Sequence, residues 1–562
     1  MSHPAQSIYR SIVYTSLVIL LGSLTACDSG VNKSSAPTGV PNQTASKPAS
    51  SAANSEIGKL EGLTGSTMDS STPPEPEAKR ASQPEEPATN ESYKSIADNQ
   101  FYTADRQPLS TFSIDVDPAS YSNVRRFIND GQLPPKDAVR IEEMVNYFPY
   151  DYPQPTGDKP FSINTEIASA PWNPQHKLVQ IGLQGKKISM EKLPPNNLVF
   201  LLDVSGSMNE PNKLPLLKAS LKLLVNELRP IDRVAVVVYA GSAGLVLTST
   251  PGNQKDKIIA ALDKLEAGGS TAGGEGIIQA YKVARENLLK DGNNRVILAT
   301  DGDFNVGVSS DDGLVKLIEK ERKGNVFLTV LGLGMGNLKD AKMEQLANKG
   351  NGNYAYIDNL MEAKKVLVKE FGSTLLTIAK DVKIQVEFNP KLVQAYRLIG
   401  YENRVLANQD FKDDKKDAGE LGAGHAVTAL YEVIPTGVKT DLKFAIPTAQ
   451  TAADKETQIA ANSNELMQVR LRYKAPKSDT SQLLTGKVDR SIAKPINTAS
   501  NNLKFAAAVA AYGMNLRNSP YKGSSNFGSI LELASQAKGA DLDGYRAEFI
   551  RLVEKSKKLT KS

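Results

Sequence analysis

Residues 197–208 read NLVFLLDVSGSM, and this stretch decides the fold of the central part of the chain. The run of apolar residues at 198–202 predicts a β-strand that is buried on both faces, as in a parallel sheet. The strand ends at Asp203, and Ser205 and Ser207 follow at alternate positions. Open α/β sheets bind their ligands at the carboxyl ends of their strands. We therefore expect one carboxylate and two hydroxyls on a loop at the ligand-binding edge of a sheet.

Two further loops carry oxygen atoms that are suited to the same site. Thr271 ends the glycine-rich stretch GGST at 268–271, and a helical pattern follows it. Asp301 comes after the apolar run VILA at 296–299, which reads as another buried strand. Carboxylate and hydroxyl oxygens are hard donors, the set that magnesium and related ions prefer. The sequence therefore predicts a divalent cation at this edge of the sheet.

The order and context of these side chains resemble the metal-ion-dependent adhesion site of the von Willebrand factor type A domain. The resemblance assigns the metal positions of that family to Asp203, Ser205, Ser207, Thr271 and Asp301. It implies a divalent cation, with magnesium as the first choice and manganese or calcium as alternatives. It also implies that Asp or Glu of a protein partner fills a coordination position left by the protein. Three neutral hydroxyls leave the charge of the ion under-compensated, which favours an incoming carboxylate.

Strand and helix patterns alternate from residue 196 to 372. Leucines at steps of three and four between 214 and 228 predict a helix with one apolar face. An edge strand is expected at 245–248, because the chain returns directly after a glycine-containing turn. Further buried strands are expected at 234–239, 296–300 and 326–333. This alternation predicts an α/β fold with a doubly wound, mostly parallel sheet.

The regions on either side of this domain have different patterns. Residues 101–195 predict a smaller α+β region, and residues 373–562 predict a β-rich domain closed by helices. In the latter, alternating apolar and polar residues predict strands at 382–388, 426–433, 440–445 and 466–473. PLSTFSIDVDPASYSNVRRF at 108–127 and AVTALYEVIP at 426–435 resemble the N-terminal extension and C-terminal domain of bacterial von Willebrand factor type A lipoproteins.

The N-terminus predicts an exported, lipid-anchored protein. The apolar stretch at 12–24 is short for a membrane span and typical of a signal peptide. It ends in LTAC at 24–27, which is similar to a bacterial lipobox, so we expect a signal peptide at 1–26 and an acyl anchor such as palmitate on Cys27. Residues 27–100 are rich in Ser, Pro, Ala and Glu and are expected to form a disordered tether. The folded part would then lie in the cell envelope outside the cytoplasm, facing the periplasm in a Gram-negative cell.

Several other classes of function are disfavoured by the sequence. A net charge of +5 over 562 residues is too weak to predict a nucleic-acid partner. Gly274 and Gly276 lack the third glycine of a dinucleotide fingerprint, and no Gly-Lys-Ser/Thr phosphate loop occurs, so no nucleotide is expected. Asp115 and Asp117 are similar to the nucleophile loop of haloacid-dehalogenase phosphatases. Ala119 stands where those enzymes usually carry Thr or Val, and we expect no catalysis there.

Side chains for catalysis are scarce. After removal of the signal peptide, His176 and His425 are the only histidines, which leaves little material for Ser-His-Asp, Cys-His or His-rich zinc sites. Asp203 and Asp301 would have to polarise a magnesium-bound water without an evident base. We therefore predict that the chain is not an enzyme.

The nearest additional carboxylates, Glu275 and Asp303, are expected to be solvated or to support the ligands. The leading hypothesis is a lipid-anchored module that binds an acidic residue of another protein through its cation. A magnesium-dependent hydrolase and a structural scaffold with an inert metal site stay open as alternatives.

Overall fold

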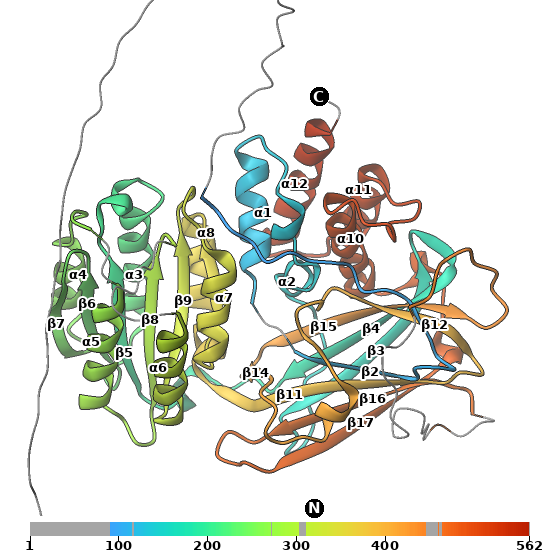
Figure 1. Ribbon diagram of the computed structural model, residues 1–562, viewed down its shortest axis with the longest axis horizontal. Coiled ribbons are helices and arrows are strands. Elements are labelled where there is room, and N and C mark those ends of the chain that lie inside the picture. Colours follow the sequence, from blue (N-terminus) through green and yellow to red (C-terminus); the bar gives the residue numbers. More distant parts are fainter. Residues whose placement is uncertain are drawn as a thin grey trace, which may run out of the picture. The chain divides into compact units, whose positions relative to one another are not determined.

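The computed structural model describes residues 90–114, 117–270, 273–302, 311–445, 459 and 463–560 (Figure 1). The predicted signal peptide, Cys27 and most of the predicted tether lie outside these residues, as do Asp115, Thr271 and Asp303. No helix within the described ranges is both long enough and apolar enough to cross a lipid bilayer.

Six strands form the sheet of a central α/β domain, in the order β10-β9-β8-β5-β6-β7. Neighbouring strands run parallel except for β7, which is antiparallel to β6 at the edge of the sheet. The strands are β5 (Asn196–Asp203), β6 (Arg233–Tyr239), β7 (Ala243–Pro251), β8 (Asn293–Thr300), β9 (Val326–Leu333) and β10 (Tyr354–Ile357). The predicted doubly wound, mostly parallel sheet and its edge strand are confirmed.

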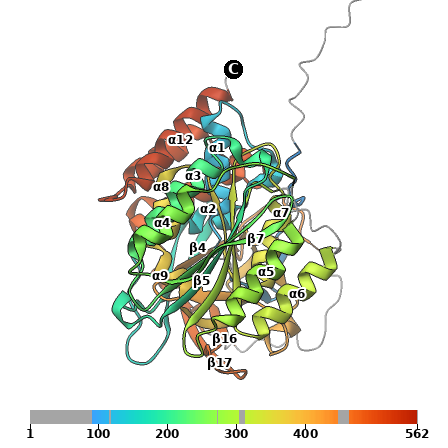
Figure 2. The ribbon, with the colours of Figure 1, turned by 90° about the vertical axis from the view of Figure 1, so that its left-hand side faces the viewer.

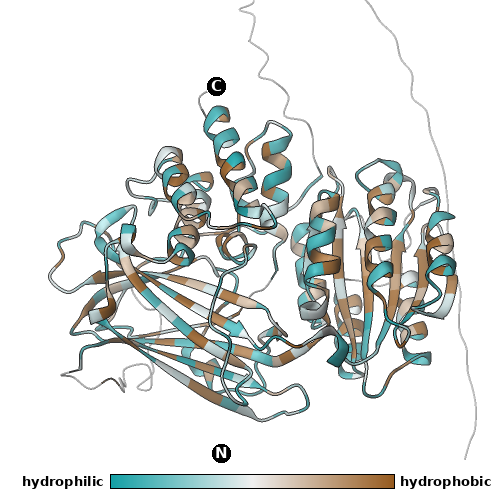
Figure 3. Cartoon of the chain, turned by 180° about the vertical axis from the view of Figure 1, so that it is seen from behind, coloured by the Kyte–Doolittle hydropathy of each residue, from teal (hydrophilic) through white to brown (hydrophobic). Residues whose placement is uncertain are grey.

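Helices cover both faces of this sheet (Figure 2). Leu198, Phe200 and Leu202 of β5 pack in one apolar cluster with α3, α4 and α8, whereas Val199 and Leu201 pack in a second cluster with α5, α6 and α7. Apolar side chains therefore occupy both sides of β5, and the helices turn their polar faces outward (Figure 3). The helices are α3 (Leu214–Glu227), α4 (Lys255–Asp263), α5 (Gly273–Glu286), α6 (Asp311–Lys323), α7 (Asp340–Lys349) and α8 (Leu360–Lys364), which continues into a π-helical turn (Lys365–Lys369).

Two antiparallel sheets form a second body, which we call the β-sandwich. One sheet has the order β1-β12-β15-β4-β3, and the other has the order β13-β2-β11-β16-β17, with β14 paired to β11. The first sheet consists of β1 (Tyr102–Thr103), β12 (Val393–Ile399), β15 (Ala426–Pro435), β4 (Asn173–Gly185) and β3 (Phe161–Ala170). The second consists of β13 (Val405–Leu406), β2 (Leu109–Ser113), β11 (Thr377–Phe388), β14 (Gly419–Gly422), β16 (Glu465–Lys474) and β17 (Ser481–Asp489).

The β-sandwich has three layers (Figure 1). Val179, Ile181 and Leu183 of β4 point into the core between the two sheets, whereas Leu178 belongs to a cluster with the helices on the outer face. This division follows from the period of two along a strand. The outer layer contains α1 (Ala119–Asn129), α2 (Ile141–Asn146), α10 (Asn501–Leu516), α11 (Phe527–Gln536) and α12 (Tyr545–Leu559), and a short helix α9 (Phe371–Leu375) precedes β11.

Both sheets combine strands from residues 101–195 with strands from residues 373–562. β4 pairs with β15 along Lys177–Gln184, and β2 pairs with β11 along Leu109–Ser113. The two outer regions that the sequence boundaries separate thus form one body, and the α/β domain is inserted between β4 and β11.

The prediction of a strand at 440–445 is wrong. This segment has no ladder; Ala445 N donates one hydrogen bond to Phe101 O (2.8 Å), and Leu442 and Phe444 pack against a small cluster around Phe101. Its alternation therefore reflects side-chain packing on the sandwich edge, where β1 already pairs with the outer side of β12.

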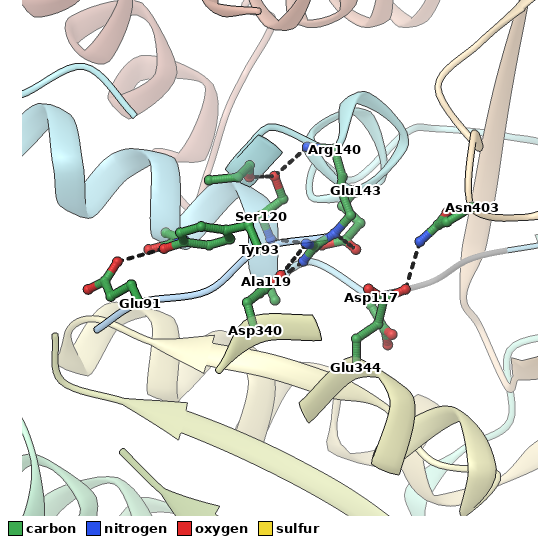
Figure 4. Close-up of polar contacts among 12 residues, drawn as sticks. Glu91, Tyr93, Asp117, Ala119, Ser120, Arg140, Glu143, Asp340, Glu344 and Asn403 are labelled. Carbon is green, nitrogen blue, oxygen red and sulfur yellow. Dashed lines mark hydrogen bonds and ion pairs between the residues drawn. The ribbon is translucent and has the colours of Figure 1, made fainter. Parts of the chain in front are cut away.

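A buried arginine links the β-sandwich to the α/β domain (Figure 4). Arg140, which precedes α2, forms ion pairs with Asp340 at the start of α7 and with Glu143 of α2. Glu143 also accepts a hydrogen bond from Ser120 N (2.8 Å). Because removal of one partner from a buried ion pair leaves an uncompensated charge, such a contact fixes relative position strongly.

Arg125 of α1 makes a second link of the same kind. Its guanidinium binds Asp358, directly after β10, and donates to Glu362 of α8 (2.7 Å). It also contacts Glu548 of α12 (3.2 Å). One side chain thus joins the α/β domain, the first helix of the sandwich and its last helix.

The first described residues also bind the α/β domain. Asn90 N and Ser92 N donate to Gly336 O and Leu338 O (2.9 Å each), and Gly336 N donates to Glu91 Oε1 (2.9 Å). The other oxygen of Glu91 accepts from Tyr93 OH (Figure 4). Residues 90–92 are therefore attached to the loop between β9 and α7.

We predict that a fragment starting at residue 373 does not fold alone. Its strands β11 and β15 would lose β2 and β4, and the apolar faces of both sheets would be exposed to water. Circular dichroism and limited proteolysis should show an unfolded or aggregated fragment, whereas the full chain under the same conditions is folded. Cooperative, protease-resistant unfolding of the fragment would contradict the shared-sheet argument.

Candidate metal centre

Three adjacent strands bring polar residues to one edge of the α/β sheet. Asp203 is the last residue of β5 and lies in register with Tyr239 at the end of β6. On the other side, β8 pairs with β5 and ends at Thr300, with Asp301 following. Because parallel neighbours end at the same edge, the two carboxylates predicted from the sequence come together here.

The carboxylate of Asp203 is fully buried and held by three donors. Oδ2 accepts hydrogen bonds from Tyr239 OH and from Thr300 Oγ1 (3.0 Å each). Oδ1 accepts from Ser205 N (2.9 Å). Burial raises the pKa of Asp203 above its ordinary value; the Ser205 hydrogen bonds oppose the rise, and the nearby charge of Asp301 adds to it. An ionised Asp203 without a cation is therefore unfavourable in the folded state.

The two serines share the loop after β5. Ser205 is buried, Ser207 is half-buried, and their Oγ atoms are 3.1 Å apart. Gly206 N donates to Gly269 O (3.0 Å), and Gly268 N donates to Val204 O (2.8 Å). The glycine-rich loop therefore lies directly against the serine loop. Thr271, two residues beyond Gly269, is outside the described residues, and its role as a ligand stays a prediction.

Asp301 is fully buried, and its two oxygens differ. Oδ2 accepts a hydrogen bond from Lys213 Nζ (3.0 Å), and the same Nζ donates to the main-chain oxygen of Ser207 (2.9 Å). Oδ1 is buried and accepts no hydrogen bond from any residue that the structure describes. Gly302 follows with φ of 115°, and a Cβ there would lie 2.2 Å from Asn337 O, so the chain after Asp301 requires glycine.

These residues fit a hard divalent cation. Asp203 and Asp301 supply two carboxylates and Ser205 and Ser207 supply hydroxyls, the donor chemistry of magnesium. The buried Oδ1 of Asp301 is the kind of orphaned acceptor that an ion satisfies. Within the described ranges no three His, Cys, Asp or Glu side chains cluster, so a site here depends on its hydroxyls.

Three residues at this edge were not identified from the sequence. Lys213 lies directly before the leucine-rich helix, Tyr239 ends a predicted strand, and Thr300 precedes Asp301. Thr300 and Tyr239 had a signal, because each is the last residue of a strand next to β5. Lys213 had none, since its Nζ reaches Asp301 across the fold.

The other candidates for chemistry lie elsewhere. Glu275 is exposed on α5, as expected for a solvated side chain. His176 of β4 pairs with Glu432 of β15 (2.6 Å), inside the β-sandwich. His425 lies just before β15, and burial lowers its pKa. Neither histidine belongs to the α/β domain that carries Asp203.

Three protein-family models match the chain. The model of the von Willebrand factor type A domain matches residues 197–369, and a model described as von Willebrand factor matches 87–180. A third, described as the C-terminal part of the uncharacterized protein YfbK, matches 373–559.

Individual proteins are similar over different lengths. The uncharacterized protein YfbK of Escherichia coli strain K12 is 46% identical over 471 residues, which cover 82% of this chain and 80% of that protein. The uncharacterized protein sll0103 of Synechocystis is 29% identical over 188 residues, 33% of this chain and 43% of that protein. Among solved structures, a von Willebrand factor type A protein from Catenulispora acidiphila aligns over 68% of this chain and 87% of its own, with 16% identity and a TM-score of 0.37.

We predict that Asp203→Asn stabilises the chain when a chelator is present. The raised pKa of Asp203 means that its ionised form costs folding free energy at neutral pH, so the amide should increase the unfolding free energy by about 0.5–2 kcal/mol. As pH falls through that pKa, the wild type takes up a proton and the difference shrinks. Urea denaturation with chelator at neutral and acidic pH measures this.

Asp291→Asn is the matched control, because Asp291 is 80% exposed in the same domain. Excess magnesium should reverse the order of stabilities by binding only the wild type. An Asp203→Asn chain that is less stable than the wild type in chelator at neutral pH would show that the carboxylate charge is compensated without an ion.

Proposed function

The chain belongs to the family of von Willebrand factor type A proteins that carry a YfbK-type C-terminal domain, and we propose that it binds an acidic residue of a protein partner through a divalent cation. Type A domains generally mediate interactions between proteins. The ion, magnesium by preference, would be held by Asp203, Ser205, Ser207, Thr271 and Asp301.

One observation carries the proposal: two buried carboxylates converge at the ends of β5 and β8, and Oδ1 of Asp301 has no donor among the described residues. A cation would bind this free oxygen and compensate the net negative charge that remains after Lys213 pairs with Asp301. An uncompensated buried charge is costly in a low-dielectric interior.

The loop geometry supports access by a partner. Gly206, Asn209 and Glu210 are exposed, and Ser207 is half-buried, so the serine loop reaches the protein surface while Asp203 stays beneath it. An ion bound below this loop would be approached from the solvent side. A carboxylate is the natural ligand there, because hydroxyl ligands bring no charge of their own.

Binding rather than catalysis is favoured by the surroundings of the site. Glu275 is exposed, and both histidines belong to the β-sandwich. The two histidines therefore lie in a different body from Asp203, and the side chain of Glu275 is in contact with solvent. We propose that the chain has no enzymatic activity at this edge of the sheet.

A lipid anchor on Cys27 would place this binding site in the cell envelope. The proposal rests on LTAC at 24–27 after an apolar stretch, and on the Ser- and Pro-rich segment that follows. The tether would give the folded part reach from the membrane.

We expect that capture of a partner requires both the ion and Asp203. In cells treated with a cross-linker, pull-down of the wild-type chain should recover a partner, and chelation or Asp203→Ala should reduce recovery at least about tenfold through the loss of metal binding. Asp291→Ala, on an exposed loop of the same domain, serves as the control and should capture normally. Equal recovery with the Asp203→Ala chain would rule out the proposed mode of binding.

Replacement of Cys27 tests the anchor separately. In a detergent phase-partition assay of whole cells, wild-type chain should enter the detergent phase because an acylated cysteine carries long apolar chains. Cys27→Ser should abolish acyl labelling and the processing that precedes it. Acyl labelling of the Cys27→Ser chain would place the lipid elsewhere.

A further inference from the structure

Lys213 is a buried ammonium at the candidate metal centre. Only 3% of the residue is exposed, and lysine is rarely buried to this degree unless its charge is paired. The residue precedes α3, and its Nζ contacts Asp301 Oδ2 and the Ser207 main-chain oxygen. Lys213 therefore bridges two of the loops that form the site.

The stem of Lys213 is held by a glycine. Gly334 has φ of 70°, and a Cβ at this position would lie 2.4 Å from Lys213 Cε and 2.5 Å from Cγ. The side chain consequently runs along the backbone after β9 with no room for a larger neighbour. This packing holds the ammonium at Asp301 and restricts its other rotamers.

The net charge of the site differs from that of two carboxylates alone. Asp203 and Asp301 contribute two negative charges, and among their described hydrogen-bond and ion-pair partners Lys213 is the one cation. Glu210, 4.0 Å from Lys213 Nζ, has a side chain that is 59% exposed and is screened by solvent. The buried group therefore carries one net negative charge before any ion binds.

We infer that Lys213 strengthens the coupling between binding of the ion and binding of the partner's carboxylate. This inference rests on the function proposed above. A divalent cation added to two carboxylates alone would give a neutral site, whereas with Lys213 present it leaves one positive charge in excess. A carboxylate from the partner cancels this charge, so each ligand increases the affinity for the other by the same factor.

The hydrogen bonds of Lys213 leave the donor atoms of the site available. The ammonium occupies Oδ2 of Asp301 and the main-chain oxygen of Ser207, while Oδ1 of Asp301 and the serine hydroxyls are not bonded to it. Lys213 would thus lower the affinity for the ion through its charge without bonding to these oxygens. It also compensates part of the negative charge when no ion is bound, which lets the chain fold before loading.

Isothermal titration of magnesium into the full chain in detergent tests the inference, with acetate as the probe carboxylate and chloride as its reference at equal ionic strength. For the wild type, we expect acetate to increase magnesium affinity at least about fivefold. Lys213→Met should bind magnesium about tenfold more tightly than the wild type in chloride, because one nearby positive charge is gone. The acetate effect should be smaller in this variant, because the excess positive charge is gone while acetate can still bind the ion.

Two further variants keep the test decisive. Lys222→Met removes an equal charge from the outward face of α3, where Lys222 pairs with half-exposed Asp263, and should behave as the wild type. Lys213→Gln is neutral and keeps a hydrogen-bond donor, so it should share the tighter magnesium binding if Lys213→Met is too unstable to purify. Thermal unfolding in chelator should give a lower midpoint for both Lys213 variants and a larger rise on addition of magnesium.

The outcomes distinguish failure of the proposed metal function from failure of the proposed role of Lys213. If the wild type binds no magnesium and neither neutral variant does, the proposed metal function itself fails. If the wild type binds magnesium but a Lys213 variant binds it no more tightly, or shows the same dependence on acetate as the wild type, the role of Lys213 is overturned while the metal function stands.

Discussion

Burial of two like charges at the ends of adjacent parallel strands is the constraint on which the candidate site depends. The parallel register of β5 and β8 places Asp203 and Asp301 side by side, and the helices on both faces of the sheet remove them from water. Three of the four carboxylate oxygens accept hydrogen bonds, from Ser205, Tyr239, Thr300 and Lys213. The fourth oxygen, Oδ1 of Asp301, has no donor among the described residues, and one negative charge is uncompensated. A divalent cation would bind the oxygen and compensate the charge.

The part of the site that depends on strand ends was predictable from the sequence. Asp203 and Asp301 each follow a buried apolar run, and parallel strands deliver their last residues to one edge, so local pattern and sheet geometry together bring them close. Lys213 was not predictable in this way. Its contact with Asp301 spans 88 positions and depends on how a long side chain lies along Gly334, which no periodic pattern encodes. Thr271 is outside the described residues, and its role as a ligand stays a prediction.

In the fold, too, local features were predictable from the sequence and long-range contacts were not. The alternation of strands and helices between β5 and β10 is local, and it was predicted correctly. Pairing of β4 with β15 and of β2 with β11 joins segments that are more than two hundred residues apart, and half-buried strands carry no signal for the identity of a distant neighbour. At 440–445 the local pattern misled the prediction. Its alternating apolar residues pack near Phe101, and the segment pairs with no strand that the structure describes. Arg140 and Arg125 then link the two bodies through buried ion pairs.

The attachment of residues 90–92 to the loop at 336–338 has a mechanical consequence. Mechanical load applied to the chain ahead of residue 90 would reach the hydrogen bonds of Asn90 and Ser92 before it reaches β1, the first strand of the β-sandwich. That loop continues from Gly334, whose backbone packs against the side chain of Lys213. The attachment of residues 90–92 and the carboxylate pair are thereby connected through one short stretch of backbone.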